Sequence, residues 1–218
     1  PTIMTAVPRF YQNLFTKINM NFEKQSGLKR KLINLTLNLG KKILKKEELS
    51  LEEKIVNFLC DKLVRKKIKK QFGGNLQAFV SGGGALDKNI GEFLNSVGLP
   101  TLQGYGLTEA SPVVSCNLPD LVKVESVGPP FRTNKVKIAK DGEILCKGPN
   151  VMKGYFKDPK LTSKTIKNDE ENYDIELFCN KSEKISGELN LAELVGKNIE
   201  GDSESYRRAI LKMREVKL

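Results

Sequence analysis

Two glycine-rich segments carry the residues whose types and spacing are best suited to chemistry. The first is Gly82-Gly83-Gly84, directly after Ser81, and the second is Gly104-Tyr105-Gly106, with Thr108 and Glu109 just downstream. Because glycine has no Cβ, its backbone N–H groups can approach a phosphate or a flat base closely. A nearby hydroxyl and carboxylate can then contact a phosphate and a hard metal ion. The pattern suits a nucleotide site, although glycine turns without a ligand have the same composition.

Several other kinds of site are excluded. The 218 residues include no histidine, so the chain can form no Ser-His-Asp triad, Cys-His pair or His-ligated metal site. Its four cysteines are too widely spaced for a zinc or redox motif and predict reduced thiols in a cytosolic protein. The GYGLTE string lacks the third glycine of a dinucleotide fingerprint, and no GxxxxGK[ST] loop is present. Chemistry must rest on carboxylates, hydroxyls, basic side chains and backbone amides.

The elements around the glycine segments read as a βαβ unit. Leu76–Val80 predicts a strand before the first segment, and Thr101–Gln103 predicts a second strand before the other. Between them, Asp87 can cap a helix whose apolar positions are Ile90, Phe93, Leu94 and Val97. The two strands should therefore be parallel, with both glycine segments at the carboxyl edge where α/β sheets bind ligands. Further on, 136–139 and 144–147 predict a hairpin around Asp141-Gly142.

The first third of the chain is basic and helical. Residues 1–77 carry a net charge of +11, residues 78–166 carry +3 and residues 167–218 carry −3. After a loop over residues 1–8, apolar side chains at helical spacing predict three amphipathic helices before Gly73-Gly74. The three stripes are Phe10/Leu14/Ile18/Phe22, Leu28/Leu32/Leu35/Leu39/Ile43 and Ile55/Leu59/Leu63/Ile68. Such stripes form a core face or attach to an anionic membrane surface; nucleic acid is not an expected partner because no binding motif accompanies the charge.

Three longer strings add a family resemblance. VSGGGAL (80–86), LQGYGLTEASPVVSCNLPD (102–120) and GEILCKGPNVMKGYFKDP (142–159) occur in the order and spacing typical of the adenylate-forming superfamily. Together with the basic helices, they resemble bacterial long-chain fatty-acid–CoA ligases over residues 1–166. The resemblance implies an α/β fold that is part of that enzyme's large domain, with amphipathic helices, a βαβ unit and a β-rich portion. That fold would be incomplete.

The resemblance also implies roles for single residues. Gly82, Gly83 and Gly84 would border adenine and the acyl group, and Gly104, Tyr105 and Gly106 would form the turn on which adenine packs. Thr108 would contact the phosphate, and Glu109 would engage the magnesium ion of ATP. The parent reaction converts a fatty acid and ATP into acyl-AMP, then transfers the acyl group to CoA. ATP, Mg²⁺ and CoA are thus the cofactors and co-substrate that the resemblance implies.

Other segments of that family have no counterpart here. We find no Ser/Thr/Gly-rich triphosphate loop, no TGD motif after the helix expected at Asp158-Pro159, and no small domain with its catalytic lysine. Residues 167–218 match nothing and form a separate acidic tail, and Pro1 is not an initiator methionine, so we expect a fragment.

Two hypotheses follow. Either the chain is a ligase fragment that is inactive alone, or it is a non-catalytic remnant that binds a membrane through residues 1–77 and nucleotide weakly. Both hypotheses predict a cytoplasmic protein, and both allow a peripheral position at the inner face of the membrane. Whether another chain supplies the missing segments stays an open question.

Overall fold

The computed structural model describes residues 1–139 and 142–166. Contacts divide the chain into two units, each described by itself below. The first comprises Pro1–Gln103 with Leu121–Glu125, and the second begins with Gly104–Asp120 and resumes at Ser126. The predicted acidic tail and Asp141 lie outside the described residues. The division that we predicted between 1–77, 78–166 and 167–218 stays a prediction.

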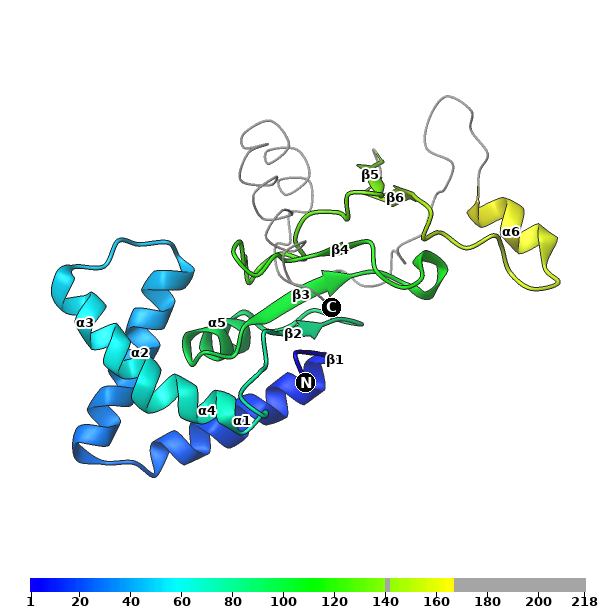
Figure 1. Ribbon diagram of the computed structural model, residues 1–218. Helices are drawn as coiled ribbons and strands as arrows, with labels where there is room; N and C mark the ends of the chain where they lie inside the picture. The colour runs from blue at the N-terminus through cyan, green and yellow to red at the C-terminus, as the bar shows by residue number, and fades with distance from the viewer. Residues whose placement is uncertain (140–141, 167–218) are drawn as a thin grey trace. The chain divides into compact units, whose positions relative to one another are not determined.

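The predicted βαβ unit forms the centre of the first unit (Figure 1). Strand β2 (Ala78–Ser81) pairs parallel with β3 (Thr101–Tyr105), and helix α5 (Lys88–Ser96) connects them. All four apolar positions predicted for this helix are buried: Ile90, Phe93, Leu94 and Val97. Asp87 caps the helix, because its Oδ1 accepts hydrogen bonds from the backbone N–H groups of Asn89 and Ile90.

One strand differs from our expectation. Residues 1–8 were predicted as loop, but Ile3–Ala6 forms strand β1, which pairs parallel with β2. The prediction was wrong because only four residues pair and the apolar Ile3 lies on the exposed side, so the sequence lacks the apolar/polar alternation of a half-buried strand. Tyr11 lies just beyond this strand. Its buried hydroxyl donates to the Val80 carbonyl oxygen at 2.9 Å, and burial raises its pKa to about 12.

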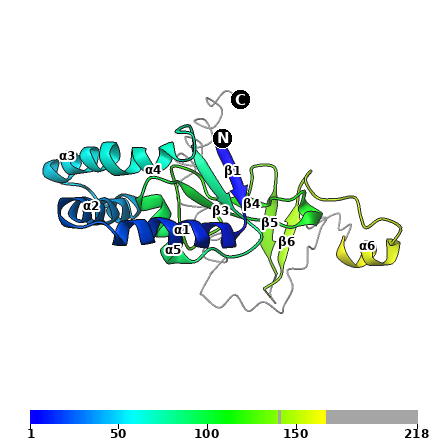
Figure 2. The same ribbon diagram turned by 90° about the horizontal axis from the view of Figure 1, so that it is seen from below.

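Three helical segments precede Gly73, as predicted. They are α1 (Pro8–Glu23), α2 (Gly27–Leu44) and a third that runs through α3 (Leu51–Cys60), the π-helical turn η1 (Asp61–Arg65) and α4 (Lys66–Lys70). The first stripe is confirmed as a core face, because Ile18 and Phe22 are buried and Phe10 and Leu14 pack against them. Figure 2 shows α3 and α4 in line, with α2 beside α3.

The second stripe is a core face only at Leu32 and Leu39, and the third is wrong as a core face. On α2, Leu28, Leu35 and Ile43 are exposed, and the buried face contains Ile33, Thr36, Leu39 and Gly40. Gly40 explains the rotation, since a Cβ there would lie 2.4 Å from the Cα of Ser96, so α2 meets α5 on its glycine side. On the third segment only Ile68 of the four predicted residues is buried.

Arg65 fixes which side of the third segment faces inward. Its guanidinium donates through Nε to the Ser96 carbonyl oxygen at 2.9 Å, through Nη1 to Asn57 Oδ1 at 2.7 Å and through Nη2 to the Thr36 carbonyl oxygen at 3.2 Å. Burial lowers the pKa of this group below its usual value. The π-turn adds one residue to the helical repeat. Because of that extra residue, Val64, Arg65 and Ile68 lie on the same buried side of the segment as Cys60.

The second unit is built from short strands and turns. The last two residues of β3 pair antiparallel with β4 (Ser115–Cys116), and β5 (Lys135–Ile138) pairs antiparallel with β6 (Ile144–Lys147), which confirms the predicted hairpin. A small core contains Ala110, Val114 and Cys146. Helix α6 (Pro159–Thr165) begins at the expected place, because Asp158 Oδ1 accepts the Leu161 N–H. No helix of residues 1–139 and 142–166 is long and apolar enough to cross a membrane.

Candidate functional site

The first glycine segment is an exposed loop at the carboxyl end of β2. The Gly82 N–H donates to the Ala6 carbonyl oxygen at 3.2 Å, which holds the loop against the end of β1. Gly83 has φ +78°, a left-handed conformation that favours glycine. Gly83 and Gly84 are exposed, so their backbone groups are available to a ligand.

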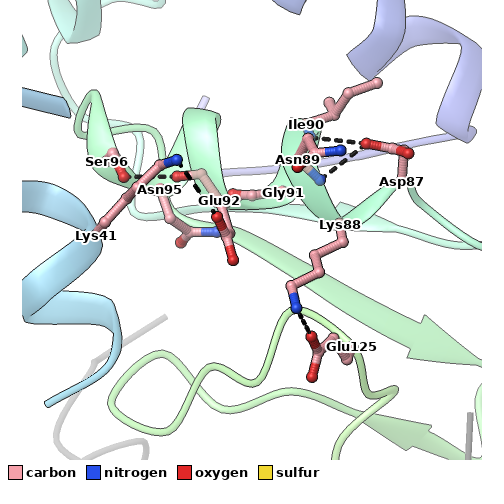
Figure 3. Close-up of polar contacts among 10 residues, drawn as sticks. All are labelled: Lys41, Asp87, Lys88, Asn89, Ile90, Gly91, Glu92, Asn95, Ser96 and Glu125. Carbon is pink, nitrogen blue, oxygen red and sulfur yellow. Dashed lines mark hydrogen bonds and ion pairs between the residues drawn. The ribbon is translucent and has the colours of Figure 1, made fainter. Parts of the chain in front are cut away.

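The far side of this loop is anchored to β3 and α5. The Leu86 N–H donates to Gln103 Oε1 at 3.0 Å, and Gln103 Nε2 donates to the Val124 carbonyl oxygen. Figure 3 shows the next residues, where Asp87 caps α5 and Lys88 forms an ion pair with Glu125. The glycine loop is thus fixed at both ends, by β1 and by the start of α5.

The second glycine segment lies in the second unit, at the end of β3. Gly104 and Tyr105 belong to that strand, and Gly106 directly follows it. A side chain at Gly106 has no room, because a Cβ would lie 1.8 Å from the Pro112 carbonyl oxygen. Tyr105 is half-buried and packs against the small core of this unit, so part of its ring is already covered by protein.

Thr108 and Glu109 form a 3-10 turn with Ala110 directly after this segment. Thr108 is exposed and Glu109 is half-buried. Hydrogen bonds from later residues fix the backbone of this turn. The Met152 N–H donates to the Glu109 carbonyl oxygen at 2.8 Å, and Asn150 Nδ2 donates to the carbonyl oxygens of Ala110 and Val113. Residues about 40 positions later therefore fix the backbone that presents Thr108 and Glu109.

The carboxylate of Glu109 is itself held by a tyrosine. The Tyr155 hydroxyl donates to Glu109 Oε1 at 2.8 Å, and this hydrogen bond raises the pKa of Tyr155, which stays a donor at neutral pH. Tyr155 is fixed in turn by its own N–H, which donates to Thr162 Oγ1 at 2.9 Å on α6. Within the described residues, no hydrogen bond or ion pair engages Glu109 Oε2.

This arrangement suits a magnesium ion that arrives with a phosphate. Mg²⁺ at nucleotide sites is held by one or two carboxylates together with phosphate oxygens and water. Glu109 supplies one such oxygen. Residues 1–139 and 142–166 contain no group of three or more Cys, Asp or Glu side chains that could hold a metal ion without such help.

Sequence reasoning missed three residues of this site: Asn150, Met152 and Tyr155. They lie in the GPNVMKGYFKDP string, which served only to recognise the family. Their contacts cross some 40 residues, and no periodic pattern reports such contacts. Of the predicted residues, Gly104 to Glu109 lie in the second unit and Gly82 to Gly84 in the first.

Comparison with known proteins decides the family. The family model described as "AMP-binding enzyme" matches residues 1–156. This chain belongs to the AMP-binding enzyme family. The mixed α/β fold is likewise confirmed by the elements described above.

Curated relatives of this AMP-binding chain are acyl-CoA ligases. Fatty acyl-CoA synthetase A of Dictyostelium discoideum is 32% identical over 184 residues, covering 78% of this chain and 26% of the relative. Long-chain-fatty-acid–CoA ligase 1 of Cavia porcellus is 30% identical over 183 residues, covering 78% of this chain and 25% of the relative. The chain therefore spans about a quarter of the length of these relatives.

Two solved structures that match part of this chain are described as follows. O-succinylbenzoate coenzyme A synthetase from Bacillus subtilis, in complex with ATP and magnesium, has a TM-score of 0.40 and 30% identity, covering 43% of this chain and 22% of that one. A benzoate CoA ligase from Burkholderia xenovorans has a TM-score of 0.47 and 18% identity, covering 76% of this chain and 26% of that one.

Proposed function

We propose that this AMP-binding chain is part of a long-chain fatty-acid–CoA ligase and supplies its adenine and magnesium contacts. The parent reaction activates a fatty acid with ATP to acyl-AMP and pyrophosphate, then forms acyl-CoA. The observation that carries the proposal is the turn at Thr108 and Glu109. Its backbone is braced by Asn150 and Met152, its carboxylate is oriented by Tyr155, and it leaves one hydroxyl exposed.

Each predicted residue has a place in this scheme. The exposed backbone of Gly83 and Gly84 would border the adenine and acyl groups, and Gly104 to Gly106, with the uncovered part of the Tyr105 ring, would face adenine. Thr108 would donate to a phosphate oxygen. Glu109 would bind Mg²⁺, which, when bound, neutralises charge on the phosphates as the acyl carboxylate attacks the α-phosphate.

Tyr155 is a positioning residue in this scheme. Its hydroxyl occupies Glu109 Oε1 and so fixes the plane of the carboxylate, which directs Oε2 toward a single position. Groups that orient a metal ligand in this way affect metal affinity by about 10- to 100-fold when they are removed.

These residues can be tested by binding, without turnover. Radiolabelled ATP is titrated into the purified 218-residue chain with and without MgCl₂, using Glu109→Gln, Tyr155→Phe and the exposed control Glu48→Gln. We expect Glu109→Gln and Tyr155→Phe to weaken the magnesium-dependent part of binding about tenfold and leave magnesium-free binding unchanged. A variant that had merely lost its structure would bind ATP more weakly both with and without MgCl₂. Equal behaviour of Glu109→Gln and Glu48→Gln would refute the magnesium role.

We further propose that these 218 residues do not activate fatty acids by themselves, since none of their segments resembles the triphosphate loop, the ribose-binding aspartate or the catalytic lysine. The purified chain is incubated with ATP, MgCl₂ and palmitate, and acyl-AMP and pyrophosphate are measured. Release of either product above a no-enzyme blank would contradict this proposal. Addition of CoA should yield no acyl-CoA.

A further inference from the structure

The outer face of the third helical segment is an exposed apolar stripe. Its members are large, lie at helical spacing and are between 46% and 79% exposed: Leu51, Ile55, Phe58, Leu59 and Leu63, which we call the α3 stripe. Single exposed apolar residues are ordinary, but a contiguous group of this kind marks an interaction surface. The stripe contains three of the four residues of the third predicted pattern, for which a core face and a membrane contact were the two alternatives.

The helix cannot turn to bury this stripe. Its other side is already packed, with Cys60, Val64 and Ile68 buried. The three hydrogen bonds of Arg65 tie that side to α2, α3 and α5. The stripe is therefore held outward by the first unit's own contacts.

The charge around the stripe is positive. The Lys62 Nζ lies 4.5 Å from the centre of the Phe58 ring, so a cation sits on the stripe itself. Lys66 and Lys70 follow Lys62 at intervals of four residues, and both are exposed. Lys54 flanks the stripe at its other end.

Acidic residues do little to offset this charge. Glu53 is engaged by Lys42 at 2.6 Å and by the helix cap at Ser50, and Asp61 is half-buried in the π-turn. Only Glu52, in the first helical turn, is an exposed acid on this helix. Over residues 27–70 the chain has 14 basic and 5 acidic residues, a net charge of +9.

The exposed apolar residues and the positive charge together favour one kind of binding partner for the α3 stripe over another. A second copy of the chain would bring another +9 segment against the first, which like-charge repulsion disfavours. An anionic lipid surface complements both features, since apolar side chains enter the boundary between headgroups and acyl chains while lysines meet the phosphates. We propose that the α3 stripe docks on an anionic bilayer surface, with Lys62, Lys66 and Lys70 contacting lipid phosphates.

This inference goes beyond the adenylation chemistry and does not depend on it. It also narrows the earlier expectation for residues 1–77, because the predicted stripe of α1 packs into the core, and the apolar residues exposed on α2 (Leu28, Leu35 and Ile43) lie seven and eight positions apart and form no continuous stripe. The membrane contact is assigned to one helix face.

Vesicle co-sedimentation of the 218-residue chain tests the docking surface. Vesicles of phosphatidylcholine with 30% phosphatidylglycerol are compared with pure phosphatidylcholine. The first variant is Ile55→Glu/Phe58→Glu, and its matched control is Met20→Glu, an exposed apolar residue of α1. The second is Lys62→Gln/Lys66→Gln/Lys70→Gln, and its control is Lys17→Gln/Lys24→Gln/Lys29→Gln, which removes the same charge from exposed positions elsewhere. Circular dichroism confirms that each variant is folded.

We expect the chain to bind the anionic vesicles, and both stripe variants to bind about tenfold more weakly while each control changes less than twofold. The lysine variant should lose most of the preference for anionic lipid. Equal binding to both vesicle types, no binding, or equal loss in the controls would overturn the proposal. So would a dimer in sedimentation velocity that Ile55→Glu/Phe58→Glu dissociates, since the stripe would then be a surface between copies.

Discussion

Helices α3 and α5 have similar amphipathic sequences and opposite surroundings. On α5 the apolar side chains Phe93 and Leu94 face inward and the charged side chains Lys88 and Glu92 form ion pairs at the surface (Figure 3). The α3 segment turns its large apolar residues outward, and a buried arginine on its inner side binds backbone and amide oxygens. Apolar periodicity thus identifies a face of a helix, but the polar contacts on the other side decide whether that face becomes core.

The largest difference should appear when one leucine is removed from each helix. Leu94→Ala on α5 leaves a cavity in a fully buried position, so we expect a loss of about 3 kcal/mol in the free energy of unfolding. Leu59→Ala on α3 removes a side chain that is already 46% exposed, so the loss should stay below about 1 kcal/mol. Urea unfolding followed by circular dichroism measures both. Equal losses would mean that the α3 stripe is covered in solution, and the comparison would fail.

Arg65 should matter more than any apolar residue of the α3 stripe. Arg65→Met removes three donors and leaves the carbonyl oxygens of Thr36 and Ser96 without their partner, at a cost of about 2 kcal/mol. Arg65→Lys should restore little, because an ammonium group cannot make the three-way contact of the planar guanidinium. Lys66→Met, at the next and exposed position, is the control and should unfold as the unaltered chain does. A neutral effect of Arg65→Met would show that packing alone orients the helix.

The N-caps of α3 and α5 should contribute equally to the free energy of unfolding, although the apolar face of α5 is buried and that of α3 is exposed. Asp87 caps α5, and Ser50 caps α3 through Oγ, which accepts the Glu53 N–H at 3.2 Å. We expect Asp87→Ala and Ser50→Ala each to cost about 1 kcal/mol. Asp87→Asn and Ser50→Thr keep an acceptor and should cost less. If Ser50→Ala had no effect, the start of α3 would be frayed in solution.

The surface ion pair of α5 should have the smallest effect. Lys88 and Glu125 are both exposed, so Lys88→Gln should leave the urea midpoint at neutral pH close to that of the control Lys54→Gln on α3. Glu125 raises the pKa of Lys88, so any contribution is complete below the pKa of lysine in the unfolded chain and disappears as pH rises through the higher folded value. A midpoint difference that persisted in 1 M NaCl would contradict this view.

Prediction from sequence was most successful where a local signal had one physical meaning. Asp87 followed by apolar residues at helical spacing identified α5 and its buried face, and the glycine segments marked the ends of β2 and β3. It failed where the outcome depends on partners distant in sequence. Gly40 turned α2 toward Ser96, and the contacts of Tyr155 with Glu109 join residues 46 positions apart. The sequence itself contains no pattern that would report such contacts.

The π-turn at Asp61–Arg65 decides where the third segment can change in length. It holds one more residue than an α-helical turn, so Cys60 and Arg65 both face inward although they lie five positions apart. Deleting one residue inside the π-turn, such as Lys62, would leave these two residues four positions apart, which is about one turn of a regular α-helix. Both would stay inside, and Leu51 to Leu59 would keep their outward direction. Deleting one residue of the regular helix before the π-turn would instead rotate the residues on either side of the deletion by about 100° relative to each other, with no apolar residue replaced.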